Sequence, residues 1–176
     1  HLLEKDPSHS MAYLNLGTGL AAGLVLGGEL WRGSRGTAGE IGHIPVDPNG
    51  PECPCGQRGC LEMVASGSAI ARQWPTDDAR PARALFAAAE SGDPRAMEVK
   101  RRFVENVAAA VRVLVLTVDV DSVVIGGGLS SLGTSLSIRH TAESPDPRCR
   151  PPRVSALTVR FRAIVYSQAR KPPGCP

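Results

Sequence analysis

The N-terminal third of the chain alternates between short apolar runs and glycine-rich turns. Residues 11–16 (M-A-Y-L-N-L) form a β-prone run that stops at Gly17. The segment G-T-G-L-A-A-G follows at 17–23 and leads into a second apolar run at 24–26, which residues 29–32 continue. This pattern predicts a β-meander, with residues 33–39 as a flexible loop.

The middle of the chain has helical periodicity instead. Residues 61–74 predict one helix that ends before Pro75, and an alanine-rich helix is predicted over 82–91, ended by G-D-P. A long helix is predicted over 94–118, with its charged residues in solvent. The apolar residues that recur at near-helical spacing in it are Met97, Phe103, Val107, Val111 and Leu114.

A β-branched run at 122–125 (S-V-V-I) follows the long helix and predicts a buried parallel strand. Gly126, Gly127 and Gly128 come next, and residues 129–131 are expected to open another helix. In open α/β sheets ligands bind at the carboxyl ends of parallel strands, and glycine lets a nucleotide lie close to the backbone. A tight strand-to-helix turn would explain the three glycines equally well.

Composition places the chain among globular proteins with one core. It has 176 residues, of which 42% are hydrophobic and 21% charged. No apolar run approaches the length of a membrane span, and no signal peptide leads the sequence. Together with clustered cysteines, these features lead us to expect a reducing compartment, the cytoplasm, and no membrane partner.

The last forty residues differ in charge and composition from the rest. Residues 137–176 contain eight Lys or Arg, two Asp or Glu and seven of the 15 prolines, a net charge of +6, whereas the preceding 136 residues carry −3. We therefore expect a globular unit over 1–136 and a divergent tail over 137–176 that is disordered or translated out of frame. A basic arm that binds nucleic acid is the alternative.

Four potential metal ligands lie within residues 39–62. His43 precedes Cys53, Cys55 and Cys60, with Gly50, Gly56 and Gly59 between them. Three thiolates and an imidazole form a donor set that tetrahedral zinc prefers, although Cys-x-Cys is tighter than the usual Cys-x2-Cys spacing. A disulfide or ordinary buried cysteines are the alternatives.

The turn Gly17-Thr18-Gly19 also has two interpretations. Its backbone N–H groups and the Thr18 hydroxyl are suited to binding a phosphate. A lone Gly-Thr-Gly, however, more often forms a plain hairpin turn.

The segment E-I-G-H at 40–43, followed by C-x-C-G-x-x-G-C-L-E at 53–62, resembles the signature of the ROK family. That family joins bacterial sugar kinases and sugar-responsive transcriptional repressors. The resemblance implies an α/β fold, an actin-like, ribonuclease-H-like ATPase lobe (the C-terminal domain of the family), with an inserted zinc loop at 39–62. It makes His43, Cys53, Cys55 and Cys60 ligands of a structural zinc, and Glu40, His43 and Glu62 contacts to a sugar.

The resemblance extends over about residues 13–136 and includes both glycine turns. It implies that Gly17, Thr18 and Gly19, with Gly126, Gly127 and Gly128, bind a nucleotide. The family's catalytic base lies in an Asn-Asp motif, and its first phosphate loop is D-x-G-G-T-like; neither occurs in these 176 residues. We therefore expect a fragment without its own catalytic residue, and ATP and magnesium only in a full-length kinase.

Two functions follow as expectations. The first is a sugar-binding lobe derived from an ATP-dependent hexose kinase, glucokinase-like or specific for N-acetyl-amino sugars. The alternative is the effector-binding domain of a sugar-responsive repressor, which would bind DNA only if a helix-turn-helix lies upstream. Ala21 and Ala22, where family kinases often have glycine, slightly favour the repressor. A homo-oligomer is expected for either.

Overall fold

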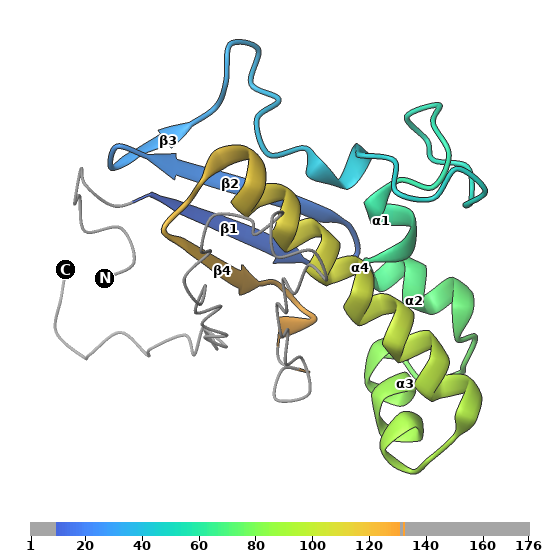
Figure 1. Ribbon diagram of the computed structural model, residues 1–176. Coiled ribbons are helices and arrows are strands. Elements are labelled where there is room, and N and C mark those ends of the chain that lie inside the picture. The colour runs from blue at the N-terminus through green and yellow to red at the C-terminus, as the bar shows by residue number, and fades with distance from the viewer. Residues whose placement is uncertain (1–9, 131, 133–176) are drawn as a thin grey trace, which may run out of the picture.

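The computed structural model describes residues 10–130 and 132, which form a four-stranded sheet and a group of helices (Figure 1). In chain order the elements are β1 (Met11–Leu16), β2 (Leu20–Leu26), β3 (Glu29–Trp31), the short 3-10 helix η1 (Ile41–His43), α1 (Leu61–Val64), α2 (Gly67–Gln73), α3 (Pro81–Glu90), α4 (Pro94–Val118) and β4 (Ser122–Gly126). The mixed α/β architecture expected from the sequence is therefore present in the described part of the chain.

The sheet has the strand order β3-β2-β1-β4. Strand β1 pairs antiparallel with β2 and parallel with β4, so β1 and β4 end at the same edge of the sheet. Side chains alternate along β1, because Leu14 and Leu16 are buried whereas Tyr13 and Asn15 point to the other face. Ile125 of β4 lies beside Leu14, which continues the buried face across the parallel pair.

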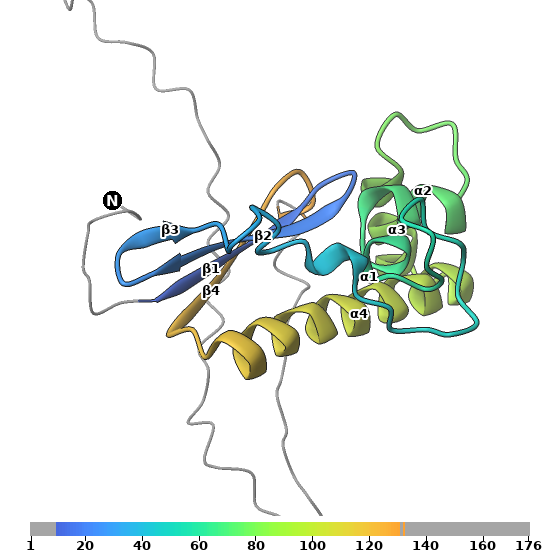
Figure 2. The ribbon, with the colours of Figure 1, turned by 90° about the horizontal axis from the view of Figure 1, so that it is seen from above.

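Helix α4 covers this buried face and extends well beyond the sheet (Figures 1 and 2). Its inner side carries Phe103, Val107 and Leu114, as predicted. Met97 was wrongly expected on that side, because its side chain is 54% exposed. Ala96, seven residues before Phe103 and so on the same face, occupies the inner position.

Helices α1, α2 and α3 gather beside the N-terminal half of α4, beyond the end of the sheet where β1 and β2 are joined (Figure 2). The rings of Phe86 in α3 and Phe103 in α4 meet edge to face, with centroids 6.3 Å apart. Helix α4 thus joins two parts of the fold, the sheet at one end and the small helices at the other.

The single helix predicted over 61–74 is wrong, because the structure divides it into α1 and α2. The backbone of Ser66 is extended, and its fully buried hydroxyl accepts a hydrogen bond of 3.1 Å from the N–H of Ala69. A serine side chain that caps a new helix competes with continuation of the old one. The break places the first residues of α2 next to the turn between β1 and β2.

The turn within the glycine-rich segment 17–23 is shorter than expected. Strand β2 already begins at Leu20, so only Gly17, Thr18 and Gly19 form the turn. Ala21 and Ala22 lie within β2, where they pair with β1. Their lack of glycine therefore does not impair the turn, and the slight preference for a repressor that it suggested has no structural basis.

Beyond β4 the chain turns at Gly127, and the description ends at Leu132. Where a helix was expected to open at 129–131, the N–H of Ser130 donates to the carbonyl of Gly127 and that of Leu132 to the carbonyl of Leu129, both at 3.1 Å, so the described residues form tight turns there. Residues 1–9 and the tail predicted over 137–176 lie outside the described residues. The division of the chain at residue 136 therefore stays a prediction.

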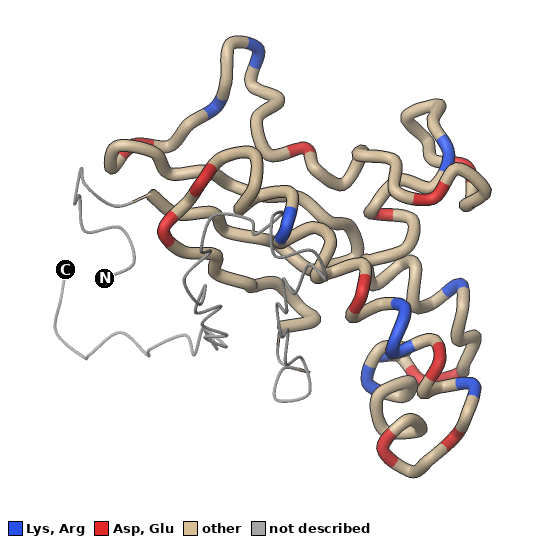
Figure 3. The backbone as a smooth tube through the Cα atoms, viewed as in Figure 1, with Lys and Arg blue, Asp and Glu red and all other residues tan. Residues whose placement is uncertain are grey.

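Charged residues are unevenly distributed over the described part of the structure. Strands β1, β2 and β4 contain none, whereas the first half of α4 is densely charged (Figure 3). There Arg101 contacts both Glu98 and Glu105, and Arg102 also contacts Glu98, which confirms the predicted solvated face. Within the described residues no helix is both long and apolar enough to cross a membrane.

Candidate functional site

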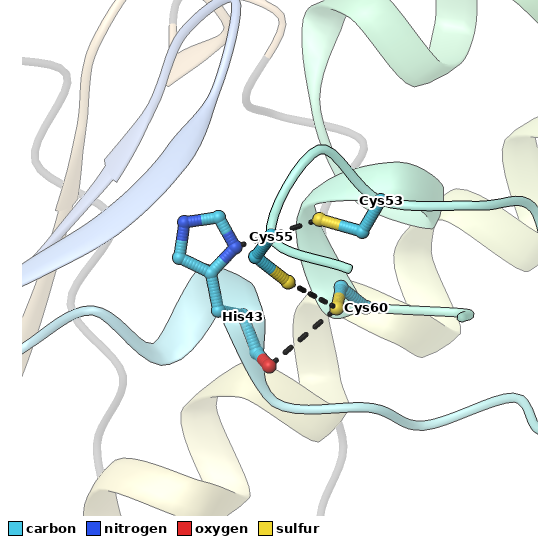
Figure 4. Close-up of side chains that lie close together, drawn as sticks. All are labelled: His43, Cys53, Cys55 and Cys60. Carbon is cyan, nitrogen blue, oxygen red and sulfur yellow. Dashed lines mark hydrogen bonds between the residues drawn. The ribbon is translucent and has the colours of Figure 1, made fainter. Parts of the chain in front are cut away.

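The four predicted metal ligands converge on one point (Figure 4). His43 lies at the end of η1, Cys53 and Cys55 lie in the following loop, and Cys60 immediately precedes α1. Their ligand atoms all lie within 4.8 Å of one another. The sequence placed these residues together correctly, although seventeen positions separate His43 from Cys60.

The distances suit a tetrahedral ion better than a disulfide. The Sγ atoms of Cys55 and Cys60 are 3.7 Å apart, and the Nδ1 of His43 lies 3.5 Å from the Sγ of Cys53. With Zn–S bonds of about 2.3 Å and a Zn–N bond of about 2.0 Å, a regular tetrahedron has edges of about 3.5–3.8 Å. All three cysteines are free thiols, so the residues fit zinc and the disulfide alternative is not realised here.

Backbone hydrogen bonds and the side chain of Gln57 support the loop from residue 44 to 60. The carbonyl of Gly59 accepts hydrogen bonds from the N–H groups of Val46 and Asp47. The side-chain amide of Gln57 donates to the carbonyl of His43 at 2.9 Å and to the Sγ of Cys55 at 3.5 Å. These contacts orient the ligands, as partners around a metal site commonly do.

The thiols of the cluster differ in acidity. Hydrogen bonds from Gln57, first from its backbone and then from its side chain, lower the pKa of the exposed Cys55 to about 6. Burial, reinforced by its Cys53 and Cys55 neighbours, raises the pKa of Cys60 to about 12. A metal ion needs all three as thiolates, so its binding must displace protons, above all from Cys60.

Gly59 should be essential to the loop, whereas Gly56 should not. Both have positive φ angles, +61° and +91°, but a Cβ at Gly59 would overlap the carbonyl of Asp47, while one at Gly56 would meet nothing within 4 Å. We expect Gly59→Ala to lower zinc affinity at least about tenfold and Gly56→Ala to lower it only a few-fold, since strain at φ alone costs roughly 1 kcal/mol. Competition with a zinc chelator measures both. Equal losses would show that close packing at Gly59 is unimportant.

The three residues predicted to bind a sugar lie beside this cluster. Glu40 is exposed and precedes η1, His43 ends η1, and Glu62 is half-buried in α1. Gly42 fits between them, because a Cβ there would lie 3.4 Å from the Cβ of Glu62 and overlap the carbonyl of Leu20. The Nδ1 of His43 faces the cysteines, which leaves its Nε2 directed away from them (Figure 4).

A cavity of about 650 Å³ opens at the carboxyl ends of β1 and β4. This is a usual size for a ligand pocket and the usual place for one in an α/β sheet. Its walls come from the β1–β2 turn, the starts of α2 and α3, and the turn after β4. They comprise Gly17, Thr18, Gly67, Ser68, Ala71, Arg80, Pro81, Ala82, Arg83, Gly128, Leu129 and Leu132.

Two turns that lie more than a hundred residues apart thus share one cavity. The cavity is lined by Gly17, Thr18 and Gly128, as expected if these residues bind a nucleotide. Gly19, Gly126 and Gly127 do not appear in its walls. Gly126 ends β4, where a Cβ would overlap the ring of Tyr13, and Gly127 has a φ of +93° and packs on the end of β1.

The sequence did not reveal the opposite wall. Ser68 begins α2, and Arg80 and Arg83 begin α3; neither guanidinium has a carboxylate partner within the part of the chain that the structure describes. The only sequence signal was S-G-S at 66–68, a helix-start signature that the prediction of one long helix overlooked.

A profile of the ROK family matches residues 3–145 of the sequence. The chain belongs to the ROK family. The match extends past residue 136, where the resemblance was expected to end, and it includes both glycine turns and all four clustered ligands.

Sugar kinases are among the curated relatives of this ROK chain. The N-acetylmannosamine kinase of Vibrio cholerae is 39% identical over 127 residues, which are 71% of this chain and 44% of the relative. The glucokinase of Thermotoga maritima is also 39% identical, over 70% of this chain and 44% of its own length. The chain thus spans about half the length, or slightly less, of the curated relatives that it matches.

Solved structures give the same family. A ROK hexokinase from Thermus thermophilus superimposes with a TM-score of 0.63 at 40% identity, over 71% of this chain and 42% of its own. A ROK glucokinase from Streptomyces griseus, solved with glucose and AMPPNP, gives 0.61 at 32% identity, over 70% and 46%. A ROK transcriptional regulator, a homologue of the E. coli MLC protein, gives 0.59 at 34% identity, over 67% and 33%.

Proposed function

We propose that this chain is the sugar- and nucleotide-binding lobe of an ATP-dependent sugar kinase that acts on a hexose or an N-acetyl-amino sugar. The observation that carries the proposal is the arrangement of two sites around one turn. The cavity lies on one side of the β1–β2 turn, and η1 and α1, with Glu40, His43 and Glu62, lie next to the strand that leaves it. A phosphoryl donor and an acceptor sugar need such adjacent sites.

The sugar side combines two carboxylates with an imidazole. Glu40 and Glu62 accept hydrogen bonds from sugar hydroxyls, and the Nε2 of His43 contacts the sugar while Nδ1 faces the metal. Because a histidine held by a metal has a fixed tautomer, it orients a hydroxyl rather than shuttling protons. The N-acetylmannosamine kinase and glucokinase relatives support this class of substrate.

The nucleotide side is the cavity. Its glycines admit a flat base close to the backbone, and apolar groups from Pro81, Ala82 and Leu129 offer surfaces for it. The hydroxyl of Thr18 donates to the phosphates, and the positive charges of Arg80 and Arg83 attract them. When bound in a full-length enzyme, ATP would supply the phosphoryl group and magnesium would neutralise charge on its phosphates.

Zinc in this proposal is structural. Four protein ligands complete a tetrahedron, so no open position is left for a water or substrate. Held by His43, Cys53, Cys55 and Cys60, the ion would fix the loop that ends at Cys60 and with it the start of α1, which carries Glu62. The cytoplasmic location and a homo-oligomeric state stay predictions.

The second candidate is the effector domain of a sugar-responsive repressor. The similarity to the ROK transcriptional regulator supports it, because that protein has comparable structural and sequence likeness over 67% of this chain. Such a domain would use the same sugar contacts without needing a nucleotide. Nucleotide binding therefore discriminates between the two functions.

Two titrations of the isotope-labelled chain, followed by backbone amide NMR, test the proposal. We expect millimolar ADP to shift the amides of Gly17, Thr18, Ser68 and Gly128, and N-acetylmannosamine or glucose to shift those of Glu40, His43 and Glu62. Glu40→Gln should abolish the sugar response, whereas Glu52→Gln, at an exposed carboxylate paired with Arg58, should leave it unchanged. A sugar response without any ADP response would favour the repressor.

A further inference from the structure

The carboxylate of Glu62 reaches from α1 to the turn between β1 and β2. Its Oε2 accepts a hydrogen bond of 3.0 Å from the backbone N–H of Leu20, the first residue of β2. The same oxygen lies so close to Gly19 that a Cβ there would be 2.5 Å from it. A carboxylate oxygen is thus packed directly against the turn that lines the cavity.

The rest of this turn is held from the other side by α2. The N–H of Gly67 donates to the carbonyl of Gly17 at 2.8 Å, and the N–H of Ser68 donates to that of Thr18 at 3.2 Å. Among these contacts only the bond to Glu62 holds the turn through a side chain. The other carboxylate oxygen, Oε1, accepts no bond from the described residues and remains available to a ligand.

We propose that Glu62 is a positioning residue for the nucleotide: one carboxylate oxygen holds the β1–β2 turn in the shape that binds phosphate, while the other is directed to the sugar. The inference rests on the proposed function and adds a role for Glu62 that sugar contact alone does not include. In this proposal a single side chain joins the nucleotide subsite to the sugar subsite. The metal loop ends at Cys60, two residues before Glu62.

Removing this carboxylate leaves the N–H of Leu20 without its acceptor. A buried donor that loses its partner destabilises the bound shape of the turn, which should lower ADP affinity by roughly five- to 150-fold when binding depends on that shape. We expect Glu62→Ala to weaken ADP binding about tenfold even when no sugar is present. Glu62→Gln keeps an acceptor oxygen at the same position and should retain most of the ADP affinity.

Gly19 offers the same test from the opposite side. Gly19→Ala introduces a methyl group that must push the flexible end of Glu62 away from Leu20, so it should weaken ADP binding as Glu62→Ala does. Gly23 in β2 is the matched control, because a Cβ there would meet nothing within 4 Å and its φ is not positive. Gly23→Ala should leave ADP affinity unchanged.

The experiment is an ADP titration of the wild-type chain and the four variants by amide NMR without sugar. Thermal unfolding and hydrogen exchange of the Leu20 amide are measured alongside.

The inference is supported if Glu62→Ala and Gly19→Ala weaken ADP binding and speed exchange at Leu20 while Glu62→Gln and Gly23→Ala do neither. If wild type binds ADP and Glu62→Ala binds it equally well, the positioning role is overturned and the proposed function stands. If all four variants weaken binding in parallel with lower thermal stability, the effect is general and the inference is overturned. If wild type fails to bind ADP, the proposed nucleotide site fails and the inference fails with it.

Discussion

Replacing Cys60 by serine should weaken zinc binding by at least about 100-fold and release the loop at 44–60 from its fixed shape. Removing only a hydrogen-bond partner of a metal ligand typically lowers metal affinity by about 10–100-fold. Cys60 is itself one of the four converging ligands, so its loss should have a larger effect. Cys60 precedes α1 without a side-chain cap bond, and serine is a favourable residue at that position, so the substitution removes essentially the metal contact.

Zinc content by mass spectrometry and loop order by hydrogen exchange measure this effect. Cys175→Ser, at a cysteine that is not one of the four predicted ligands, is the matched control and should bind one zinc with unchanged affinity. Treating the wild-type chain with a strong chelator should reproduce the exchange pattern of Cys60→Ser. If Cys60→Ser binds zinc as tightly as wild type, the cluster is not the metal site.

The purified 176-residue chain should not phosphorylate glucose or N-acetylmannosamine with ATP. ROK kinases take the proton of the attacking hydroxyl with an aspartate in an Asn-Asp motif, and these residues contain no such motif. A positioned base contributes about 10²–10⁴-fold to the rate, roughly 3–5 kcal/mol of the barrier. The two glycine turns and the sugar contacts alone would then bind substrates without turning them over.

A coupled ADP-release assay, with a full-length ROK kinase as positive control, tests this expectation. Glu40→Gln distinguishes true turnover from contamination, because an activity that survives this change comes from a host enzyme. Sustained turnover that Glu40→Gln abolishes would show that the chain carries a base which the sequence did not reveal.

Regular elements with strong periodicity could be predicted from the sequence, and their interruptions could not. Strands β1 and β4 and helix α4 lie within one or two residues of the predicted ranges, because apolar alternation and helical spacing are properties of neighbouring residues. The break at Ser66 escaped prediction, because it depends on a buried hydroxyl that competes with the helix. Met97 was misplaced because a large apolar residue suggested the inner face, whereas the geometry of the helix gives that position to Ala96.

The candidate site divides in the same way. The metal ligands could be recognised because their donor chemistry is specific and their spacing is short. The cavity could be predicted only on the side of Gly17, Thr18 and Gly128, where glycine has a local meaning. The structure was needed to recognise Arg80, Arg83 and Ser68 as cavity residues, because the fold brings the starts of α2 and α3 to the same edge. No local sequence pattern distinguishes them from surface residues.

The length of α4 has a consequence for how this chain can vary. The helix contains 25 residues, about 37 Å at 1.5 Å per residue, and packs on the small helices near Ala96 and on the sheet near Leu114. Inserting one residue between these points would rotate everything after it by about 100° and turn Leu114 away from the strands. Insertions and deletions in related sequences should therefore be absent from α4 and should accumulate at 34–37 and 75–79, two loop segments whose residues are exposed.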